Sequence, residues 1–366
     1  MQSLITKVKV LFLAVVILSP LTTAKANAGR PGTFQFGYGA RVSLHEPALD
    51  TVLQTIEETG FDWLAVNYDW AHHWPQRDII PQWEQLDYLM DFTQAHNIAV
   101  MVSITGCPTW AKGETGPSLY ETANLIVTLQ KRYPNSLGAV ELFPAPNTIQ
   151  GWGAFPNPAD YAHLLNYIHE TLQANSLETD IVLGGLMPLL EGVTSPGDMH
   201  DLDFLNGLYK AITIEYMPVI GLRFPNLVGQ PYQSPSSSVR NSVLRHYEQI
   251  RQVMLDNGHK SGLIWITGFS WPSELSNVLE QNTPDLQAQW LQEAYHWISS
   301  QIYVGVAFFT ISQPNNAVSS DFSHPAFQSL QQQISIEKAQ NQIPLPITYR
   351  SKFAFKSFRK ILCFNP

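Results

Sequence analysis

Aromatic side chains stand at or just after the ends of the short apolar segments of this sequence. The set comprises Trp70, Trp74, Trp110, Trp152, Phe155, Tyr232 and Trp271. Flat rings stack on the apolar C–H faces of a pyranose while the sugar hydroxyls bind polar groups nearby, so this set predicts a carbohydrate site. The alternative is that the rings cover a large core, because aromatic side chains bury much apolar area in many proteins.

Polar candidates stand at the same segment ends. Arg223 carries a planar fork of donors that fits a carboxylate, which suits a ligand such as a uronic acid. The alternative is an ion pair between Arg223 and one of the many acidic residues. His45, His72 and His73 are suited to hydrogen bonds with sugar hydroxyls, or are ordinary loop histidines. No Cys and His residues have the spacing of metal ligands, so we expect neither a metal nor another cofactor.

Eight apolar segments alternate with helical patterns and must position these side chains. The predicted strands are Gln35–Val42, Trp63–Trp70, Ala99–Cys107, Ala139–Asn147, Ile181–Met187, Val219–Phe224, Leu263–Trp271 and Val304–Ile311. Eight strands, each followed by a helix, over about 250 residues or more are typical of a single (β/α)8 TIM barrel of the α/β class. In such a barrel the chemistry lies at the C-terminal ends of the strands, where the aromatic residues fall.

The helix signals agree with this order. Asn157 followed by Pro158 predicts an N-cap and a proline at the first helical position, and another helix is predicted from Thr283-Pro284. The alternative architecture is a doubly wound open sheet, whose first strand would lead through a glycine-rich phosphate loop into a helix. Residues 37–40 run into an apolar strand end instead, which favours the barrel.

Charge is uneven along the 366 residues, which hold 21 basic and 30 acidic side chains and a formal net charge of -9. Residues 1–28 contain three lysines and no acidic residue, and residues 339–366 contain five basic residues and no acidic one. The body between them is therefore strongly acidic. Phosphate binding needs a basic face, so this balance argues against nucleic acid as a partner.

The N-terminal segment has the features of a signal peptide. An apolar run from Val10 to Leu18 follows two lysines, and Ala26 and Ala28 supply the small residues of a cleavage site. This run is too short to span a bilayer, which needs about 20 residues. We expect a signal peptide at 1–28, the barrel at 29–338 and a basic C-terminal tail at 339–366, in a protein that is secreted or held in the periplasm or cell envelope.

The basic tail mixes its charges with aromatic and aliphatic side chains, a composition that suits contact with an anionic membrane or cell-wall polymer. A disordered terminus, or a strap over the acidic barrel, is the alternative. The two cysteines, Cys107 and Cys363, would pair only if the tail folded back over the body. A domain of this size does not need such a crosslink.

Several segments together resemble the retaining glycoside hydrolases of clan A, and among them glycoside hydrolase family 39. They follow the predicted second, third, fifth and eighth strands and read Asp62-Trp63 with Trp70, Thr105–Ala111, Gly184–Pro188 and Asp321–Phe327. The resemblance covers nearly the whole body. It implies a (β/α)8 barrel, an oligo- or polysaccharide as the partner, and a pair of catalytic carboxylates at the ends of the fourth and seventh strands.

The sequence departs from this family at both catalytic positions. The family motif E-[IV]-W-N-E-P-N matches Glu141–Asn147, which places Ala145 at the acid/base and Pro144 at the asparagine that contacts the sugar. The motif W-[IV]-T-E-F-G-W matches Trp265–Trp271, with Gly268 at the nucleophile. The resemblance implies that Asn147 belongs to the sugar site. We interpret Glu141, four residues before Ala145 and on the same side of the predicted strand, as a structural residue lower in the barrel.

These observations give three hypotheses. The first is a catalytically inactive barrel that binds a saccharide or a partner in the former cleft through Trp70, Trp110, Asn147, Trp152, Arg223, Tyr232 and Trp271. The second is an active glycoside hydrolase with relocated carboxylates, drawn from Glu191, Asp198, Asp201, Asp203 and Glu274. The third is an envelope scaffold that binds no sugar and whose cleft is filled by its own Arg223 or Phe143.

Overall fold

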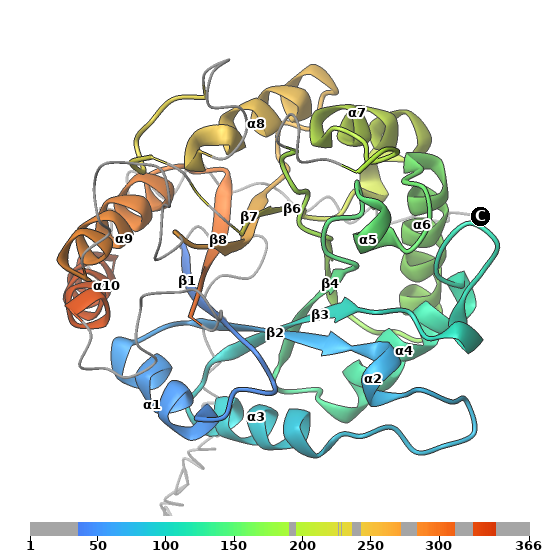
Figure 1. The fold of residues 1–366 in the computed structure, drawn as a ribbon, viewed down its shortest axis with the longest axis horizontal. Coiled ribbons are helices and arrows are strands. Elements are labelled where there is room, and N and C mark those ends of the chain that lie inside the picture. Colours follow the sequence, from blue (N-terminus) through green and yellow to red (C-terminus); the bar gives the residue numbers. More distant parts are fainter. Residues whose placement is uncertain are drawn as a thin grey trace, which may run out of the picture.

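A computed structural model describes residues 36–189, 195–225, 227, 229–235, 243–271, 284–311 and 325–341. Eight parallel strands in these residues form a ring that is surrounded by helices (Figure 1). They are β1 (Gly37–Val42), β2 (Trp63–Asp69), β3 (Ala99–Thr105), β4 (Leu137–Leu142), β5 (Asp180–Leu183), β6 (Ile220–Phe224), β7 (Ile264–Phe269) and β8 (Val304–Thr310). The predicted (β/α)8 TIM barrel is confirmed.

The ring closes between β5 and β6. The order of hydrogen-bonded strands is β5-β4-β3-β2-β1-β8-β7-β6. Isolated parallel bridges join Val182 to Val219 and Leu186 to Leu222, at the two ends of that order. Because all the strands are parallel, their C-terminal ends surround one mouth, and side chains from distant parts of the chain meet there.

Helices of very different length surround the ring. They are α1 (Leu49–Thr59), α2 (Trp70–His73), α3 (Glu84–Ala95), α4 (Leu119–Arg132), α5 (Ile149–Trp152), α6 (Pro158–Ala174), α7 (Asp201–Ala211), α8 (Tyr247–Asp256), α9 (Pro284–Ser299) and α10 (Pro325–Asn341). Helix α6 begins as predicted, because the Asn157 side chain accepts a hydrogen bond from the Ala159 N–H at 3.0 Å and Pro158 stands in the first turn. Helix α9 begins at Pro284, also as predicted. In the part of the chain that the structure describes, no helix is long and apolar enough to cross a membrane.

Two apolar clusters hold the barrel together. The larger one fills the space between the strands and the outer helices. The smaller one groups four large side chains with small aliphatic residues of the strands, all of them fully buried. The large ones are Trp63, Met101, Trp265 and Phe308, and the small ones are Ala65, Ala139, Val182 and Val306. Trp63 and Trp265 meet edge to face with ring centroids 5.0 Å apart. The inward side chains are apolar in this cluster and become polar above it, toward the C-terminal ends of the strands.

Two predicted strands were too long by several residues. Strand β5 ends at Leu183, whereas the sequence predicted a strand to Met187. Strand β4 ends at Leu142, whereas the sequence predicted a strand to Asn147. Phe143 and Ala145 follow with φ angles of 49° and 60°, in the left-handed region that non-glycine residues seldom adopt. Side-chain alternation therefore ends at Leu142, and the expectation that Glu141 and Ala145 share one side of a strand was wrong.

Several features predicted from the sequence lie outside the described residues. They are the signal peptide at 1–28, nearly all of the basic tail at 339–366, Cys363, Glu191 and Glu274. Helix α10 continues to Asn341, three residues past the predicted end of the barrel at 338.

Candidate functional site

A polar layer lies inside the barrel, directly above the inner apolar cluster. Five residues of this layer each lie two or four positions after an inward residue in the lower half of the same strand. Because side chains alternate along a strand, these five also point to the inside of the barrel. They are Asn67, Ser103, Glu141, Thr267 and Thr310. Arg41 from β1 and Arg223 from β6 complete the layer.

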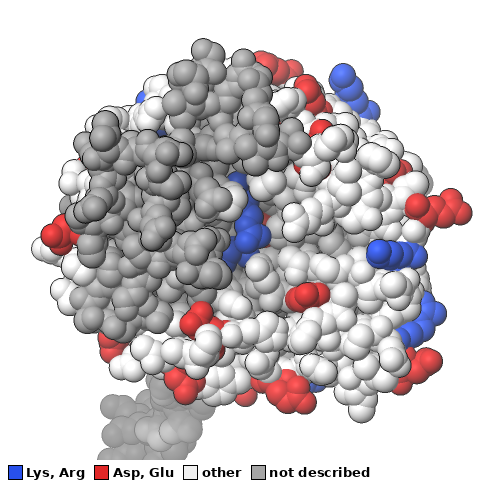
Figure 2. All heavy atoms as spheres, in the orientation of Figure 1, with Lys and Arg blue, Asp and Glu red and all other residues white. Residues whose placement is uncertain are grey.

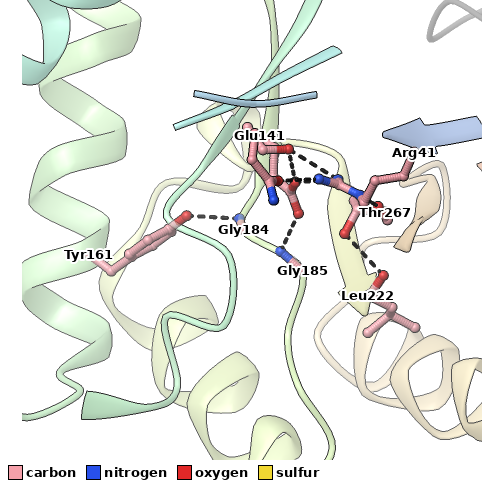
Figure 3. Close-up of polar contacts among 9 residues, drawn as sticks. Arg41, Glu141, Tyr161, Gly184, Gly185, Leu222 and Thr267 are labelled. Atoms are coloured by element: carbon pink, nitrogen blue, oxygen red, sulfur yellow. Dashed lines mark hydrogen bonds and ion pairs between the residues drawn. The ribbon is translucent and has the colours of Figure 1, made fainter. Parts of the chain in front are cut away.

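Arg41 is the centre of this layer (Figure 3). Its Nε donates to the Thr267 carbonyl oxygen at 2.5 Å and its Nη1 to Asn67 Oδ1 at 2.6 Å. Its Nη2 donates to Ser103 Oγ at 3.0 Å and to Glu141 Oε2 at 2.8 Å. One buried guanidinium thus ties β1 to β2, β3, β4 and β7, which fixes the shape of the barrel mouth from below.

Glu141 is fully buried, and both of its carboxylate oxygens accept hydrogen bonds. Oε2 accepts hydrogen bonds from Arg41 and Ser103, and Oε1 accepts one from the Gly185 N–H at 2.9 Å (Figure 3). Burial alone would raise the pKa of Glu141, but the charges of Arg41 and Arg223 and hydrogen bonds from Ser103 and Thr267 outweigh it and lower that pKa. Glu141 is therefore a carboxylate at neutral pH, and the predicted structural role of this residue fits its contacts.

Arg223 lies in β6, and its contacts differ from those of Arg41. It forms no hydrogen bond or ion pair with any residue in the described part of the chain, and part of its surface remains exposed. Burial and the nearby charge of Arg41 together lower the pKa of the guanidinium to about 10, while the charge of Glu141 opposes both effects. The alternative of an ion pair with a rim acid is not realised among the described residues.

The positions aligned with catalytic carboxylates hold no titratable atom at the mouth. Gly268 lies in β7, opposite Arg223 of β6 in the sheet register. A Cβ on Gly268 would point into the barrel, 3.2 Å from Arg41 Nε and 3.4 Å from Thr310 Oγ1. Ala145 follows β4 in the left-handed region, and its N–H donates to the Gly185 carbonyl oxygen at 2.9 Å.

Three of the aromatic residues predicted to bind sugar are buried. Trp70 has no exposed surface, and Trp152 and Trp271 are exposed by 3% and 5%. The indole of Trp152 donates to the Thr115 carbonyl oxygen at 2.9 Å, and that of Trp271 donates to the Gly229 carbonyl oxygen at 3.0 Å. In this structure the three rings pack the loops around the mouth and present no free face to a ligand.

Other aromatic residues keep accessible surface. Tyr232, in the segment after β6, is 51% exposed. Trp110, in the segment after β3, is partly exposed; it meets the Trp70 ring edge to face at 5.5 Å, and the Arg77 guanidinium lies over it at 5.6 Å. Phe155, in the segment after β4, is 71% exposed, and Trp74, in the segment after β2, is partly exposed. Together with Tyr232 and Trp110, these rings are the members of the predicted set that keep accessible surface.

Asn147 is buried and forms three hydrogen bonds with the segment that follows β5. Its Nδ2 donates to the carbonyl oxygens of Met187 and Met199, each at 2.9 Å. Its Oδ1 accepts from the Met187 N–H at 3.0 Å. The amide therefore joins two loops, and both of its N–H donors are used within the protein.

A stack of four rings beside β2 was not predicted from the sequence. The rings of Trp83, Tyr68, His73 and His45 follow one another with centroid separations of 5.5, 4.9 and 5.5 Å and nearly parallel planes. His73 is buried, and neither of its ring nitrogens has a partner within the described part of the chain. Burial, followed by the neighbouring His72 and His45, lowers the pKa of His73. The sequence could have indicated this stack, because His45 and His73 follow the adjacent strands β1 and β2.

The remaining acidic candidates have structural partners where they are described. Asp198 accepts hydrogen bonds from the Ile149 and Ser195 N–H groups at 2.8 and 3.1 Å. Asp201 pairs with His246 at 2.5 Å inside the protein, and Asp203 is exposed on α7. Among the described residues no group of three or more His, Cys, Asp or Glu side chains is placed to hold a metal ion.

Solved structures with a similar barrel are glycoside hydrolases. A family 39 glycoside hydrolase from the gut symbiont Bacteroides cellulosilyticus WH2 has a TM-score of 0.59 and 16% identity, over 85% of this chain and 65% of that enzyme. A family 30 endoxylanase from Clostridium papyrosolvens C71 has a TM-score of 0.53 and 14% identity, over 83% and 72% of the two chains. The fold is that of the clan A glycoside hydrolases.

A β-glucosidase from Exiguobacterium marinum extends this range, with a TM-score of 0.53, 11% identity and coverage of 85% of this chain and 99% of the enzyme. No protein-family model and no curated protein matches the sequence. This glycoside hydrolase-like barrel therefore shares its backbone with enzymes of several families, and it spans about 65% of the length of the family 39 enzyme. What its mouth does must be argued from its own residues.

Proposed function

We propose that this chain is an exported glycoside hydrolase-like barrel that binds an oligo- or polysaccharide at its mouth and does not hydrolyse it. The observation that carries the proposal is that two positions hold residues without a titratable side chain. They are Ala145, just after β4, and Gly268, near the end of β7. Export is proposed on the signal-peptide pattern of residues 1–28.

Hydrolysis with retention needs two carboxyl groups about 5–5.5 Å apart, one to protonate the leaving oxygen and one to attack the anomeric carbon. The carboxylate of the polar layer, Glu141, is enclosed and accepts hydrogen bonds from Arg41, Ser103 and the Gly185 N–H. It cannot leave this position without breaking the layer that supports the mouth. Loss of a general acid alone costs about 10²–10⁴-fold in rate, and without a nucleophile the covalent route is absent.

Binding does not need those carboxylates. The mouth keeps a half-exposed Tyr232, a partly exposed Trp110 and the guanidinium of Arg223, which together offer stacking surfaces and a fork of donors. The ordered layer beneath them is held by hydrogen bonds within the barrel, so it supplies a rigid floor at no cost in ordering on binding.

The first experiment measures binding and turnover in the same samples. We expect calorimetry with a panel of neutral and acidic oligosaccharides to show saturable binding, while product analysis after prolonged incubation shows no new reducing ends. Released products that disappear in a Glu274→Ala variant would contradict the proposal and favour relocated carboxylates. An absence of binding to every oligosaccharide would favour the scaffold hypothesis.

A matched pair of tyrosine variants tests where the sugar binds. Tyr232 after β6 and Tyr88 on the outer helix α3 have nearly equal exposure, 51% and 49%. Stacking of a ring on a sugar is lost when the ring is removed, so Tyr232→Ala should weaken binding severalfold and Tyr88→Ala should leave it unchanged. Equal effects, or none, would remove the mouth as the binding site.

Restoring the carboxylates asks whether the ancestral geometry persists. The double variant Ala145→Glu with Gly268→Glu is assayed on aryl glycosides of different sugars, beside each single variant. Activity in the double variant alone would identify the sugar that the mouth accepts, because both groups are required for retention.

A further inference from the structure

Arg223 is placed so that its side chain enters the centre of the barrel. A Cβ added to Gly185, at the end of β5, would lie 2.9 Å from Arg223 Cβ and 2.3 Å from Thr267 Oγ1. Arg223 therefore stands at the level of the polar layer, beside the strand that carries Gly268. Figure 2 shows basic atoms in the hollow at the middle of this face, where the eight strands supply only Arg41 and Arg223 as basic residues.

The charges of this layer do not balance. Arg41 and Arg223 carry two positive charges, and Glu141 supplies one negative charge. Both oxygens of Glu141 are occupied by Arg41, Ser103 and the Gly185 N–H, so its hydrogen-bonding capacity is taken. The five N–H donors of Arg223 have no acceptor within the described part of the chain. Among the described residues, the centre of the barrel thus holds one positive charge without a counter-charge.

Such an arrangement costs folding free energy, because a guanidinium that leaves water without a counter-charge loses hydration that nothing replaces. The lowered pKa of Arg223 has the same origin, since burial and the charge of Arg41 both disfavour its protonated form. A bound anion would supply the missing partner. Gly268 lies opposite Arg223 in the register and supplies no counter-charge, because it has no side chain.

We propose that Arg223 binds an anionic substituent, a carboxylate or a sulfate, of the saccharide held at the mouth. The inference rests on the proposed function, and it adds that the ligand is an acidic saccharide. The planar fork of a guanidinium fits either group through two parallel hydrogen bonds, and the wall of the site is already fixed by the Arg41 network.

The test compares oligosaccharides of equal length by calorimetry. An oligogalacturonide is measured beside its methyl ester, and a sulfated galactose oligomer beside the unsulfated one. We expect the acidic member of one pair to bind about 10- to 100-fold more tightly, the usual effect of hydrogen bonds to a charged group. Preference within the first pair assigns a carboxylate, and preference within the second assigns a sulfate.

Variants link the preference to Arg223. Arg223→Gln should abolish the difference between the acidic and the neutral ligand while neutral binding persists, and Arg223→Lys should retain part of it. Gly268→Glu should supply an internal counter-charge and weaken acidic ligands only. Lys131→Gln, an exposed change of the same charge on α4, should leave all affinities unchanged.

Thermal unfolding shows whether each variant is folded, so that a change in affinity can be assigned to the binding site. Arg223→Gln removes an unpaired charge, so it should fold and melt no lower than the wild type. Equal affinity of the wild type for both members of each pair would overturn the inference and leave saccharide binding intact. Binding of no saccharide at all would instead overturn the proposed function.

Discussion

Replacing Glu141 by Gln tests the claim that one buried carboxylate holds the barrel mouth in shape. The substitution keeps the size of the side chain and removes its charge. Arg41 and Arg223 then share the barrel interior without a counter-charge, and the Gln amide cannot accept all three hydrogen bonds that Glu141 accepts from Arg41, Ser103 and Gly185.

The expected loss follows from these contacts. Removing one partner of a buried ion pair costs about 3–5 kcal/mol, because the remaining charge stays buried. Glu141 is fully buried and its Arg41 partner is 2% exposed, so this range applies without reduction for solvent screening. For a domain of this size, about 3–5 kcal/mol corresponds to a fall of roughly 5–8 °C in melting temperature.

The pH dependence gives a second signature. The folded pKa of Glu141 lies below its unfolded value, so the unfolded chain binds the proton more readily. The contribution of Glu141 is therefore complete above the unfolded pKa of about 4.3 and is lost as the pH falls further. The difference between the wild type and Glu141→Gln should be constant from pH 6 to 8 and shrink in more acidic buffers.

Urea unfolding followed by fluorescence measures both effects. The control is Glu248→Gln, which breaks the surface pair between Glu248 of α8 and Arg245 in the turn before that helix and should cost about 0.3–0.5 kcal/mol. The double variant Arg41→Met with Glu141→Leu should lose less than the sum of its single variants, because neither member of this pair then remains buried without the other. A loss below about 1 kcal/mol for Glu141→Gln would refute the reasoning.

Three further outcomes follow from other contacts. The pKa of His73 is lowered, so its protonation favours unfolding as the pH falls below the unfolded value of about 6.5; His73→Phe, which keeps the ring stack, should reduce the loss of stability between pH 7 and 5 in urea titrations. Asn147→Asp should cost about 2–5 kcal/mol in the same assay, because a carboxylate would face two carbonyl oxygens that now receive hydrogen bonds. Gly185→Ala should lower the melting temperature, since its Cβ would lie 2.3 Å from Thr267 Oγ1 and cost about 1–3 kcal/mol; an unchanged melting curve would show that the layer can shift.

The sequence predicted the barrel because its strand and helix patterns are local. The eight apolar segments became the eight strands, and Asn157 with Pro158 began α6 as their hydrogen-bonding properties require. The end of β4 could not be predicted in this way. Phe143 and Ala145 adopt left-handed backbone angles that neither residue type favours, so the contacts of the folded chain must impose them.

The site was harder to predict, because burial and partnership are properties of the folded chain. Position after a strand placed Trp70, Trp152 and Trp271 near the mouth, but only the packing of the loops shows that these rings are covered. Asn147 has the residue type of a sugar ligand, and its amide is instead used by Met187 and Met199. A sequence with 30 acidic residues gives no sign that Arg223 finds none of them among the described residues.

Position 268, which has no carboxylate, and Arg223, which has no partner among the described residues, lie next to each other in the same polar layer. A carboxylate at position 268 would lie opposite Arg223 in the register and within reach of Arg41, and two arginines would then face two glutamates. With glycine there, the layer keeps one excess positive charge, and the guanidinium of Arg41 lies against the backbone beside it. The absence of a carboxylate at position 268 and the proposed anion site at Arg223 therefore have one origin. A barrel that had only lost activity would gain stability by replacing Arg223 with a neutral residue, so its presence argues for selection on binding.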